Sequence, residues 1–486
     1  MPVRIVAANR GLIESTSIAL RGTGTDVSVT FAVMEIDIDE ATSCVSGTEV
    51  DGSHITLTGP DHVAASAFDV DGILTDSAAY SIAAADHFGA TRTAALPRRE
   101  LDLAHLLTFC TTHVEVDGQP VPAWADLSGV YPTRNGRHIQ IHCNFAHHAD
   151  GVVARLGCAP DRESVAAAIA EREAFELEAE LIEDGMIGAA IRTLSEWDAH
   201  PHAAATRDLP LISVEQLSAA GPVVDSASDG DALPLGGLRV LDCSRVLAGP
   251  VAGQVLASLG ADVIRLGADH LPSVPVGVMS TGFGKRNASL DLRTERGAEQ
   301  MAMLLADTDV WIDAYRPGAL ENLSFSAELA ANRRPGIVVV QVSAFDWTGP
   351  WGGRRGFDSI VQSTTGIRWA GGAAATDDVG GPIGLPVQAL DYATGFLAAG
   401  VAAHLVAHQR RVGGSWLARL SLLRTRNWLV RRQGPEAFQP APVAVDARFL
   451  HGVDSDFGRL TSVRPLAGRV GTAPRRLGTS PPTWTT

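Results

Sequence analysis

The chain has 486 residues, which is more than one ordinary domain holds and enough for two or three hydrophobic cores. Hydrophobic residues make up 45% and charged residues 19%, a composition typical of a soluble globular protein. The net charge of −16, without a basic stripe, argues against a nucleic-acid partner. The sequence has no run of about eighteen apolar residues, so we expect no membrane span. The first residues lack the basic and apolar pattern of a signal peptide, so we expect a cytoplasmic protein.

The first half of the chain predicts a region of uncertain fold followed by a small α/β segment. Residues 1–115 show weak strand alternation over the first 60 positions and carry no recognisable motif. Residues 116–220 contain Asn135-Gly136, a strong hairpin signal between two apolar runs, and continue with helical periodicity. Residues 221–235 are small, polar and acidic, as in an interdomain linker.

The second half of the chain predicts a parallel sheet covered by helices. Strands are expected at 238–242, 262–266, 310–313 and 336–342, and helices at 250–259, 294–305 and 392–408. Strands that alternate with helices in this way favour an α/β fold with a Rossmann-like parallel sheet, here over residues 236–435. Residues 436–486 are dense in Pro, Gly and Arg and by themselves predict a tail.

Three segments at predicted strand ends could bind an anion. Residues 239–250 end a strand and begin a helix, whose free N–H groups attract anions, although by shape alone an ordinary turn is favoured. The only lysine, Lys285, stands beside Arg286 in a glycine-flanked stretch that suits either phosphates or a solvated basic turn. Tyr315 and Arg316 follow the third strand and suit a stacked nucleotide or a plain turn equally.

A glycine-rich loop over residues 371–382 carries Asp377 and Asp378, and Asp391 follows at the start of the long apolar helix. A carboxylate beside a helix N-terminus stays ionised and can attack a thioester. The alternative, favoured by composition alone, is that Asp377 and Asp378 are solvated turn residues and that Asp391 is an N-cap.

Metal and hydrolase chemistry find little support. His138 and His142 have the spacing of a helical zinc pair, but the hairpin signal before them predicts a strand and no third ligand is evident, so we expect no metal. The five cysteines form no CxxC pair and are expected to be free thiols. Serine hydrolase, zinc protease and P-loop signatures are all missing from the sequence.

Seven segments in order resemble the family III CoA-transferases, the group that includes formyl-CoA transferase, carnitine CoA-transferase and α-methylacyl-CoA racemase. They are Pro-Leu-x-Gly-Leu-Arg-Val-Leu-Asp (234–242), Arg-Val-Leu-Ala-Gly-Pro (245–250), Leu-Gly-Ala-Asp-Val-Ile-Arg (259–265), Gly-Lys-Arg-Asn-Ala-Ser-Leu-Asp-Leu (284–292), Asp-Val-Trp-Ile-Asp-Ala-Tyr-Arg-Pro-Gly (309–318), Val-Ser-Ala-Phe-Asp-Trp-Thr-Gly-Pro (342–350) and Gly-Phe-Asp (356–358). Each is weak alone, but the ordered series is specific.

The resemblance implies a Rossmann-like large domain over 236–435, a small α/β domain over 116–220 and a closing segment, 436–486, packed on the small domain. It implies an interlocked homodimer with no permanently bound cofactor, acting on an acyl-CoA thioester and a carboxylic acid. An aspartate would attack the thioester and carry CoA to the second acid; Asp378 fits this role slightly better than Asp377. CoA contacts are implied at Val246, Leu247, Ala248, Arg265, Tyr315 and Arg316.

Departures from the family pattern leave two other functions open. In the racemase branch a base falls at Asp391 and its partner histidine at Phe357, which cannot carry a proton, so racemisation or epimerisation is disfavoured. A catalytically degenerate CoA-binding subunit is suggested by Gly267, Ala314 and Asn322, which replace residues usual in the family. The small domain also precedes the large one, so the chain resembles a permuted or fused member.

Overall fold

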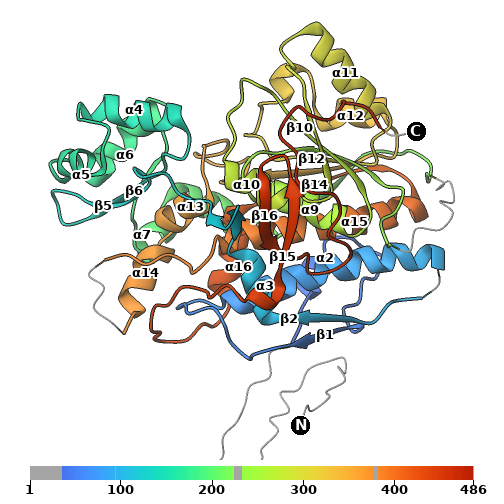
Figure 1. Cartoon of the computed structure of the whole chain (residues 1–486), viewed down its shortest axis with the longest axis horizontal. Coiled ribbons are helices and arrows are strands. Elements are labelled where there is room, and N and C mark those ends of the chain that lie inside the picture. The colour runs from blue at the N-terminus through green and yellow to red at the C-terminus, as the bar shows by residue number, and fades with distance from the viewer. Residues whose placement is uncertain (1–34, 94, 224–232, 377–380, 485–486) are drawn as a thin grey trace, which may run out of the picture.

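The large part of the molecule is built on a seven-stranded sheet (Figure 1). The computed structural model describes residues 35–93, 95–223, 233–376 and 381–484. In spatial order the strands are β11 (Lys285–Ser289), β10 (Asp262–Gly267), β9 (Arg239–Cys243), β12 (Val310–Asp313), β13 (Val338–Ser343), β14 (Ser415–Ser421) and β8 (Ser213–Ser218). All neighbours pair in parallel except β14 and β8, which are antiparallel. The α/β fold with a parallel sheet is therefore confirmed.

The strand order reverses at β9. From β9 the chain builds outward through β10 to β11, and it then returns to the other side of β9 to add β12, β13 and β14. β13 is buried at all six positions, as a strand covered on both faces must be. The connecting helices are α9 (Ala248–Ser258), α10 (Pro275–Thr281), α11 (Glu295–Ala306) and α12 (Ala327–Arg333). α9 begins two residues before Pro250, where the sequence predicted its start.

Two helices of 24 residues each form the centre of the core. α15 (Ala389–Val412) contains the buried helix that the sequence predicted, and α2 (Val70–Thr93) packs along it (Figure 1). The two helices approach so closely at Gly400 that a Cβ atom there would lie 2.4 Å from the Tyr80 ring. The Tyr80 hydroxyl and His404 Nδ1 are 3.1 Å apart across this contact. α15 is long and apolar enough to cross a membrane, but its apolar window is entirely buried inside the protein.

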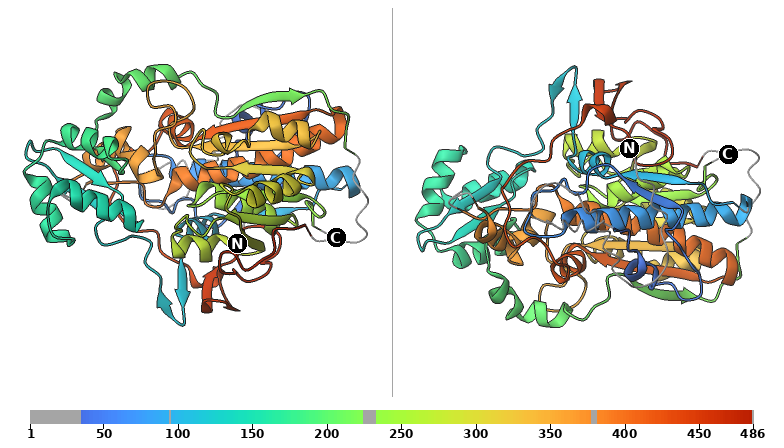
Figure 2. Two further views of the ribbon diagram at one scale, coloured as in Figure 1. Left: turned by 90° about the horizontal axis from the view of Figure 1, so that it is seen from above. Right: turned by 90° about the horizontal axis from the view of Figure 1, so that it is seen from below.

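A small α/β unit lies at one end of the molecule in both views of Figure 2. It consists of β5 (Gly129–Pro132), β6 (His138–Ile141), β7 (Gly188–Ala190), α4 (Ala146–Leu156), α5 (Arg162–Ala170) and α6 (Ala174–Glu183), with a hydrophobic core of its own. β5 and β6 pair antiparallel around Gly136, whose φ of 73° favours glycine, so the predicted hairpin is confirmed.

The N-terminal region wraps the central helices. Of the first 60 residues, 1–34 lie outside the described part, and among 35–60 the structure has helix α1 (Asp39–Thr42) and strand β1 (Ile55–Thr58). β1 pairs in parallel with β2 (Arg99–Asp102), and α3 (Leu103–Cys110) follows. The remaining helices are α7 (Leu194–Asp198), α8 (Pro201–Thr206), α13 (Asp358–Thr364), α14 (Ile367–Ala374) and α16 (Leu422–Arg431), with short 3-10 turns at Glu321–Leu323 and Ala447–Phe449.

The C-terminal segment, which the resemblance packs on the small domain, forms two strands in residues 450–463. β15 (Leu450–Ser455) and β16 (Gly458–Val463) pair with β3 (Val114–Val116), which pairs in turn with β4 (Gln119–Pro120). The last residues run along β11, where Ser480 N–H donates to the Asn287 carbonyl at 2.8 Å. Trp484 packs against the core beneath α11 and donates to the Leu304 carbonyl at 3.0 Å. The segment thus covers the edge of the large sheet, which would otherwise be open.

Candidate active site

The residues implied to bind CoA come together at the carboxyl ends of the central strands. Ligands in open α/β sheets bind at this edge, at the point where the strand order reverses. The connection after β9 and the connection after β12 flank that point, and β10 adjoins it. Those connections and that strand carry the six residues Val246, Leu247, Ala248, Arg265, Tyr315 and Arg316.

Arginines without full partners gather at this edge. Arg265 is 4% exposed, and its Nη1 has no hydrogen-bond partner among the described residues. Burial lowers the pKa of Arg245, and the positive charges of Arg265 and Arg355 lower it further. Burial raises the pKa of the Tyr315 hydroxyl, which lies close enough to Arg265 and Arg245 to be affected by their charges. A concentration of positive charge in a chain with a net charge of −16 is a local anion site.

A cleft of about 360 Å³ lies between the small α/β unit and the large sheet. Ile182 and residues 185–188 line one side, and residues 350–355 line the other together with Arg316. Burial and the nearby Arg316 charge both lower the pKa of Arg355, whose guanidinium donates to the Gly185 carbonyl at 2.8 Å. Arg316 and Arg355 are exposed, so an anion in the cleft can reach both.

Arg354 holds the two sides of this cleft together. Its Nη2 donates to Glu178 Oε1 at 3.0 Å and to the Gly188 carbonyl at 3.2 Å. Glu178 also receives a bidentate pair from Arg192, with distances of 3.1 and 2.5 Å. The Arg354 guanidinium lies 4.0 Å from the centre of the Trp351 ring, which adds a cation–π contact.

Lys285 and Arg286 differ from their predicted setting. They lie on strand β11, not in a loop, because residues 285–289 pair with β10. The Lys285 ammonium is fully buried and donates to Asp242 Oδ2 at 2.8 Å and to the Pro250 carbonyl at 2.6 Å. Arg286 forms a bidentate pair with Asp262 at 3.0 and 2.6 Å. Both charges already have carboxylate partners, so the structure does not present either of them to a phosphate, and Lys285 is no solvated turn.

Asp391 is not an N-cap but the third residue of α15, after Gln388 at the cap position. Its backbone N–H donates to Asp358 Oδ2 at 2.9 Å, and its carboxyl accepts from the backbone N–H of Ala248, at the start of α9. Burial, together with the charge of Asp358, raises the pKa of Asp391 well above its ordinary value. The prediction that Asp391 stays ionised is therefore wrong, because the site is dry and already holds a second carboxyl.

Asp358 is the other half of this buried acid pair. It begins α13 and is fully buried, and it also accepts a hydrogen bond from the Gln362 side chain. Burial raises the pKa of Asp358 to about 6, against the opposing pull of its hydrogen bonds and of the Arg368 charge. Two carboxyls in one apolar site share their protons, so at neutral pH the pair retains at least one.

Asp377 and Asp378 lie outside the described residues. Both flanks of their loop are in place, since Thr376 N–H donates to the Phe438 carbonyl at 3.0 Å and Ile383 N–H donates to the Arg368 carbonyl at 2.9 Å. The flank at Ile383 therefore lies next to Arg368, whose charge acts on Asp358, and the flank at Thr376 lies next to Phe438.

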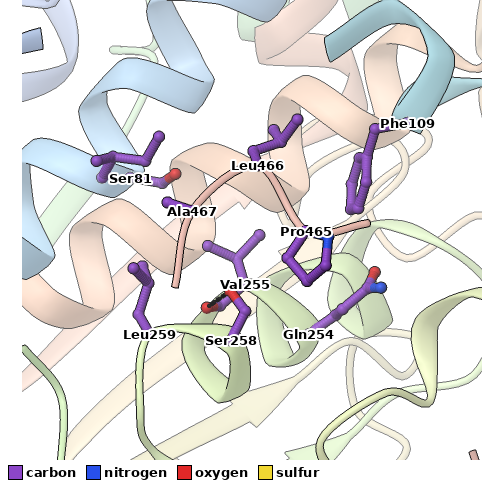
Figure 3. A pocket seen from close by; sticks show the side chains of 10 residues that line it. Ser81, Phe109, Gln254, Val255, Ser258, Leu259, Pro465, Leu466 and Ala467 are labelled. Atoms are coloured by element: carbon purple, nitrogen blue, oxygen red, sulfur yellow. Dashed lines mark hydrogen bonds between the residues drawn. The ribbon is translucent and has the colours of Figure 1, made fainter. Parts of the chain in front are cut away.

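A second, smaller cavity has no part in this site. It measures about 10 Å³ and lies where residues 465–467 cross α2 and α9 (Figure 3). Its walls are mostly apolar, and the Ser258 hydroxyl in it already donates to the Val255 carbonyl at 2.8 Å. The space corresponds to about one water molecule and is too small for a substrate.

Sequence reasoning missed Arg245, Arg354, Arg355 and Asp358 as parts of the site. Arg245 and Asp358 stood inside the family-like segments, but no charge partner could be assigned to them from the sequence. The run Gly353-Arg354-Arg355-Gly356 carried a usable signal, because paired arginines between glycines at a strand end favour anion binding.

Residues 235–447 match the model of the family described as CoA-transferase family III. This part of the chain is similar to CoA-transferase family III. The chain is 34% identical over 195 residues to a probable fatty acyl-CoA transferase of Mycobacterium tuberculosis, a match that covers 37% of this chain and 48% of that protein. An acetyl-coenzyme A transferase of Hypoxylon pulicicidum is 28% identical over 257 residues, covering 51% of this chain and 43% of its own.

The match to solved structures is also partial. The crystal structure of a hypothetical protein of Mycobacterium tuberculosis is 31% identical and covers 41% of this chain and 57% of that one, with a TM-score of 0.37. The chain thus spans about half the length of the relatives that it matches. The residues that match the family model include the sheet edge, the arginines and the acid pair described above.

Proposed function

We propose that the protein is an acyl-CoA:carboxylate CoA-transferase, which moves CoA from a thioester to a second carboxylic acid. The carrying observation is the group of arginines without full partners at the sheet edge, where Arg265 and Arg245 lie beside Tyr315 and where Arg316 and Arg355 face the cleft. Phosphates and pyrophosphate are the ligands that such a group selects, and an aromatic side chain nearby can stack on a base. The family match supports CoA as the carrier of those phosphates.

We propose that the reaction proceeds through a covalent aspartyl intermediate. The carboxylate of Asp378, or of Asp377, attacks the thioester carbonyl carbon. The C–S bond then breaks, so that the CoA thiolate departs and the acyl group remains on the aspartate as a mixed anhydride. The thiolate then attacks the aspartyl carbonyl, releases the first acid and leaves CoA on the enzyme as an aspartyl thioester. The second acid repeats these steps in reverse order. Asp391 is less suited to this role, because a protonated carboxyl is a poor nucleophile.

Trapping the intermediate tests the chemistry. The protein is incubated with a panel of acyl-CoA thioesters and quenched with hydroxylamine, which converts an aspartyl thioester to a hydroxamate detected by peptide mass spectrometry. We expect the hydroxamate on Asp378 or Asp377 and its loss in the matching alanine variant, with Asp391→Asn retaining it. If no thioester gives an adduct although CoA binds, the transferase proposal fails.

Binding of CoA is tested separately by calorimetry with Arg265→Gln, and with Arg286→Gln as a matched control. Loss of one charged hydrogen-bond donor to a phosphate lowers affinity by about ten- to a hundredfold, from roughly 1.5–3 kcal/mol per contact. Arg286 is paired with Asp262 and should leave affinity unchanged. Equal affinities of wild type and Arg265→Gln would remove the sheet edge as the CoA site.

Racemisation at the α-carbon remains the alternative enzyme function, and a degenerate CoA-binding subunit the alternative without catalysis. Deuterium wash-in at the α-carbon, in the absence of an acceptor acid, would favour racemisation over transfer. CoA binding with neither adduct nor wash-in would favour the degenerate subunit. The resemblance also leads us to propose a cytoplasmic homodimer, and light scattering on the purified protein measures the dimer directly.

A further inference from the structure

A continuous cluster of rings joins the small α/β unit to the acid pair of the large one. His142, just after β6, stacks on Phe357 with ring centres 4.0 Å apart and an interplanar angle of 20°. Trp124 meets the same His142 ring edge-on at 5.6 Å. Phe357 directly precedes Asp358, so His142 lies next to the start of α13, where the buried carboxyls are found.

A second histidine extends the cluster toward the arginines. His148, in the first turn of α4, lies edge-on to Phe145 at 5.5 Å, and Phe145 is also 6.2 Å from Phe357. The Arg245 guanidinium sits 5.1 Å from the centre of the Phe145 ring. The ring cluster therefore contacts Arg245 at the proposed CoA site and adjoins Asp358 of the acid pair, and we place the acyl end of a bound thioester there.

Both histidines are buried with hydrogen-bonding capacity unused. His142 and His148 are each 4% exposed, and Nδ1 of each ring has no partner in the part of the chain that the structure describes. A buried polar group without a partner is unfavourable by about 1–3 kcal/mol, and core packing alone would favour another phenylalanine. Two such histidines, joined through Phe145 and Phe357, point to a ligand that supplies the missing oxygen.

The charge states of His142 and His148 suit hydrogen-bond donation and do not suit proton transfer. Burial, with a smaller effect of His148, lowers the pKa of His142 to about 3, and burial with the charges of His147, Arg355 and Arg245 lowers the pKa of His148 to about 4. The groups that face them are these cations and uncharged rings, and both imidazoles are neutral at physiological pH. A neutral imidazole offers one N–H donor and exchanges no proton at this pH. A metal is not indicated, since the described residues contain no group of three or more side chains placed to ligate one.

We propose that His142 and His148 donate ring N–H hydrogen bonds to the acyl carbonyl oxygen of the bound thioester. The inference rests on the proposed function, because it needs an acyl-CoA in the site. When a carboxylate attacks the carbonyl carbon, the new C–O bond forms as the carbonyl π electrons move onto oxygen, and the C–S bond then breaks as the carbonyl re-forms. The two imidazoles stabilise the charge on that oxygen, and no proton changes place. The small unit thereby contributes to recognition of the acyl group.

The test uses butyryl-CoA labelled with ¹³C at the carbonyl, and follows the infrared band of the bound carbonyl. In the wild type we expect a shift to lower wavenumber on binding, since hydrogen bonds polarise the C=O bond. His142→Phe keeps the ring stack on Phe357 and should return the band most of the way to its position in water-free solvent, and His148→Gln should give a smaller return. His147→Phe is the matched control, because His147 is exposed and should leave the band unchanged.

Binding of unlabelled CoA separates this inference from the proposed function. His142→Phe should bind free CoA within about twofold of wild type, while turnover falls by about a hundredfold or more with little change in KM, as for removal of an oxyanion donor. If wild type binds no CoA, the proposed function fails and this inference with it. If wild type binds CoA and His142→Phe gives the same carbonyl band as wild type, the histidine inference alone is overturned.

Discussion

Loss of the Glu178 charge should lower the free energy of unfolding, because this carboxylate joins the two sides of the cleft. It is 4% exposed and accepts hydrogen bonds from two buried arginines, Arg192 of the small unit and Arg354 of the loop opposite. Glu178→Gln keeps the size and shape of the side chain but removes its charge, so both guanidiniums stay buried without a counter-ion. Breaking a buried pair on one side destabilises a protein by about 3–5 kcal/mol.

Glu180 offers a matched control on the same helix. It also meets two arginines, Arg155 at 3.8 Å and Arg172 at 2.5 Å, but its side chain is 31% exposed. Exposed pairs are screened and replaced by water when broken, so Glu180→Gln should leave stability close to that of wild type. The two variants therefore differ in burial and hardly in chemistry.

Urea unfolding followed by tryptophan fluorescence measures the difference, since Trp351 lies against Arg354 and reports on this contact. Glu178→Gln should unfold at a clearly lower urea concentration than Glu180→Gln, and its CoA affinity should fall as the cleft loosens. Equal urea midpoints for the two variants would refute the argument that the burial of an ion pair determines how much the pair contributes to the free energy of unfolding.

Three further predictions follow from individual positions. Burial raises the pKa of Asp358 from 3.8 to about 6, so the native state holds this proton more tightly than the unfolded chain does. The proton's contribution to the free energy of unfolding is therefore complete below about pH 4 and is lost as the pH rises through about 6. Asp358→Asn should flatten the fall in the free energy of unfolding over that range. Unchanged slopes in urea titrations at several pH values would contradict this. Asp346 has a φ of 73°, a backbone conformation that favours glycine, yet its carboxylate pairs with the buried Arg424 at 2.5 and 3.1 Å. Asp346→Gly should therefore lower the melting temperature although it relieves the backbone, and a rise would show that the strain outweighs the ion pair. Gly366 has a φ of 88°, and a Cβ atom there would lie 2.6 Å from the backbone of Leu194. Gly366→Ala should therefore lower the free energy of unfolding by more than about 1 kcal/mol in the same assay. No change would mean that α7 and α14 can move apart to make room for the methyl group.

The elements that the sequence predicted well are those fixed by local pattern. The run Val338–Val342 could only be a buried strand, Asn135-Gly136 could hardly be anything but a turn, and the alanine-rich stretch from Tyr392 had to be a buried helix. Each depends on neighbours within one element, and each is found in the structure.

The parts that could not be predicted depend on residues far apart in the chain. Glycines around Lys285 indicated a loop, but pairing with β10 makes it a strand and the distant Asp242 takes its charge. Asp391 stood beside a helix start and was expected to be ionised, but Asp358 shares its site from 33 positions away. The C-terminal residues have the composition of a tail, yet β3, more than 300 positions earlier, offers β16 a partner strand.

The burial of Lys285 has a practical consequence for work on this protein. No other lysine occurs in the sequence, and the side chain of the one present is fully buried although it stands on the edge strand β11. Amine-reactive dyes, cross-linkers and acetylating reagents therefore find no side-chain target on the folded protein. Any modification that does appear at Lys285 marks molecules in which its contacts with Asp242 and the Pro250 carbonyl have opened, so a single peptide in a mass spectrum measures the rate at which this edge of the sheet opens.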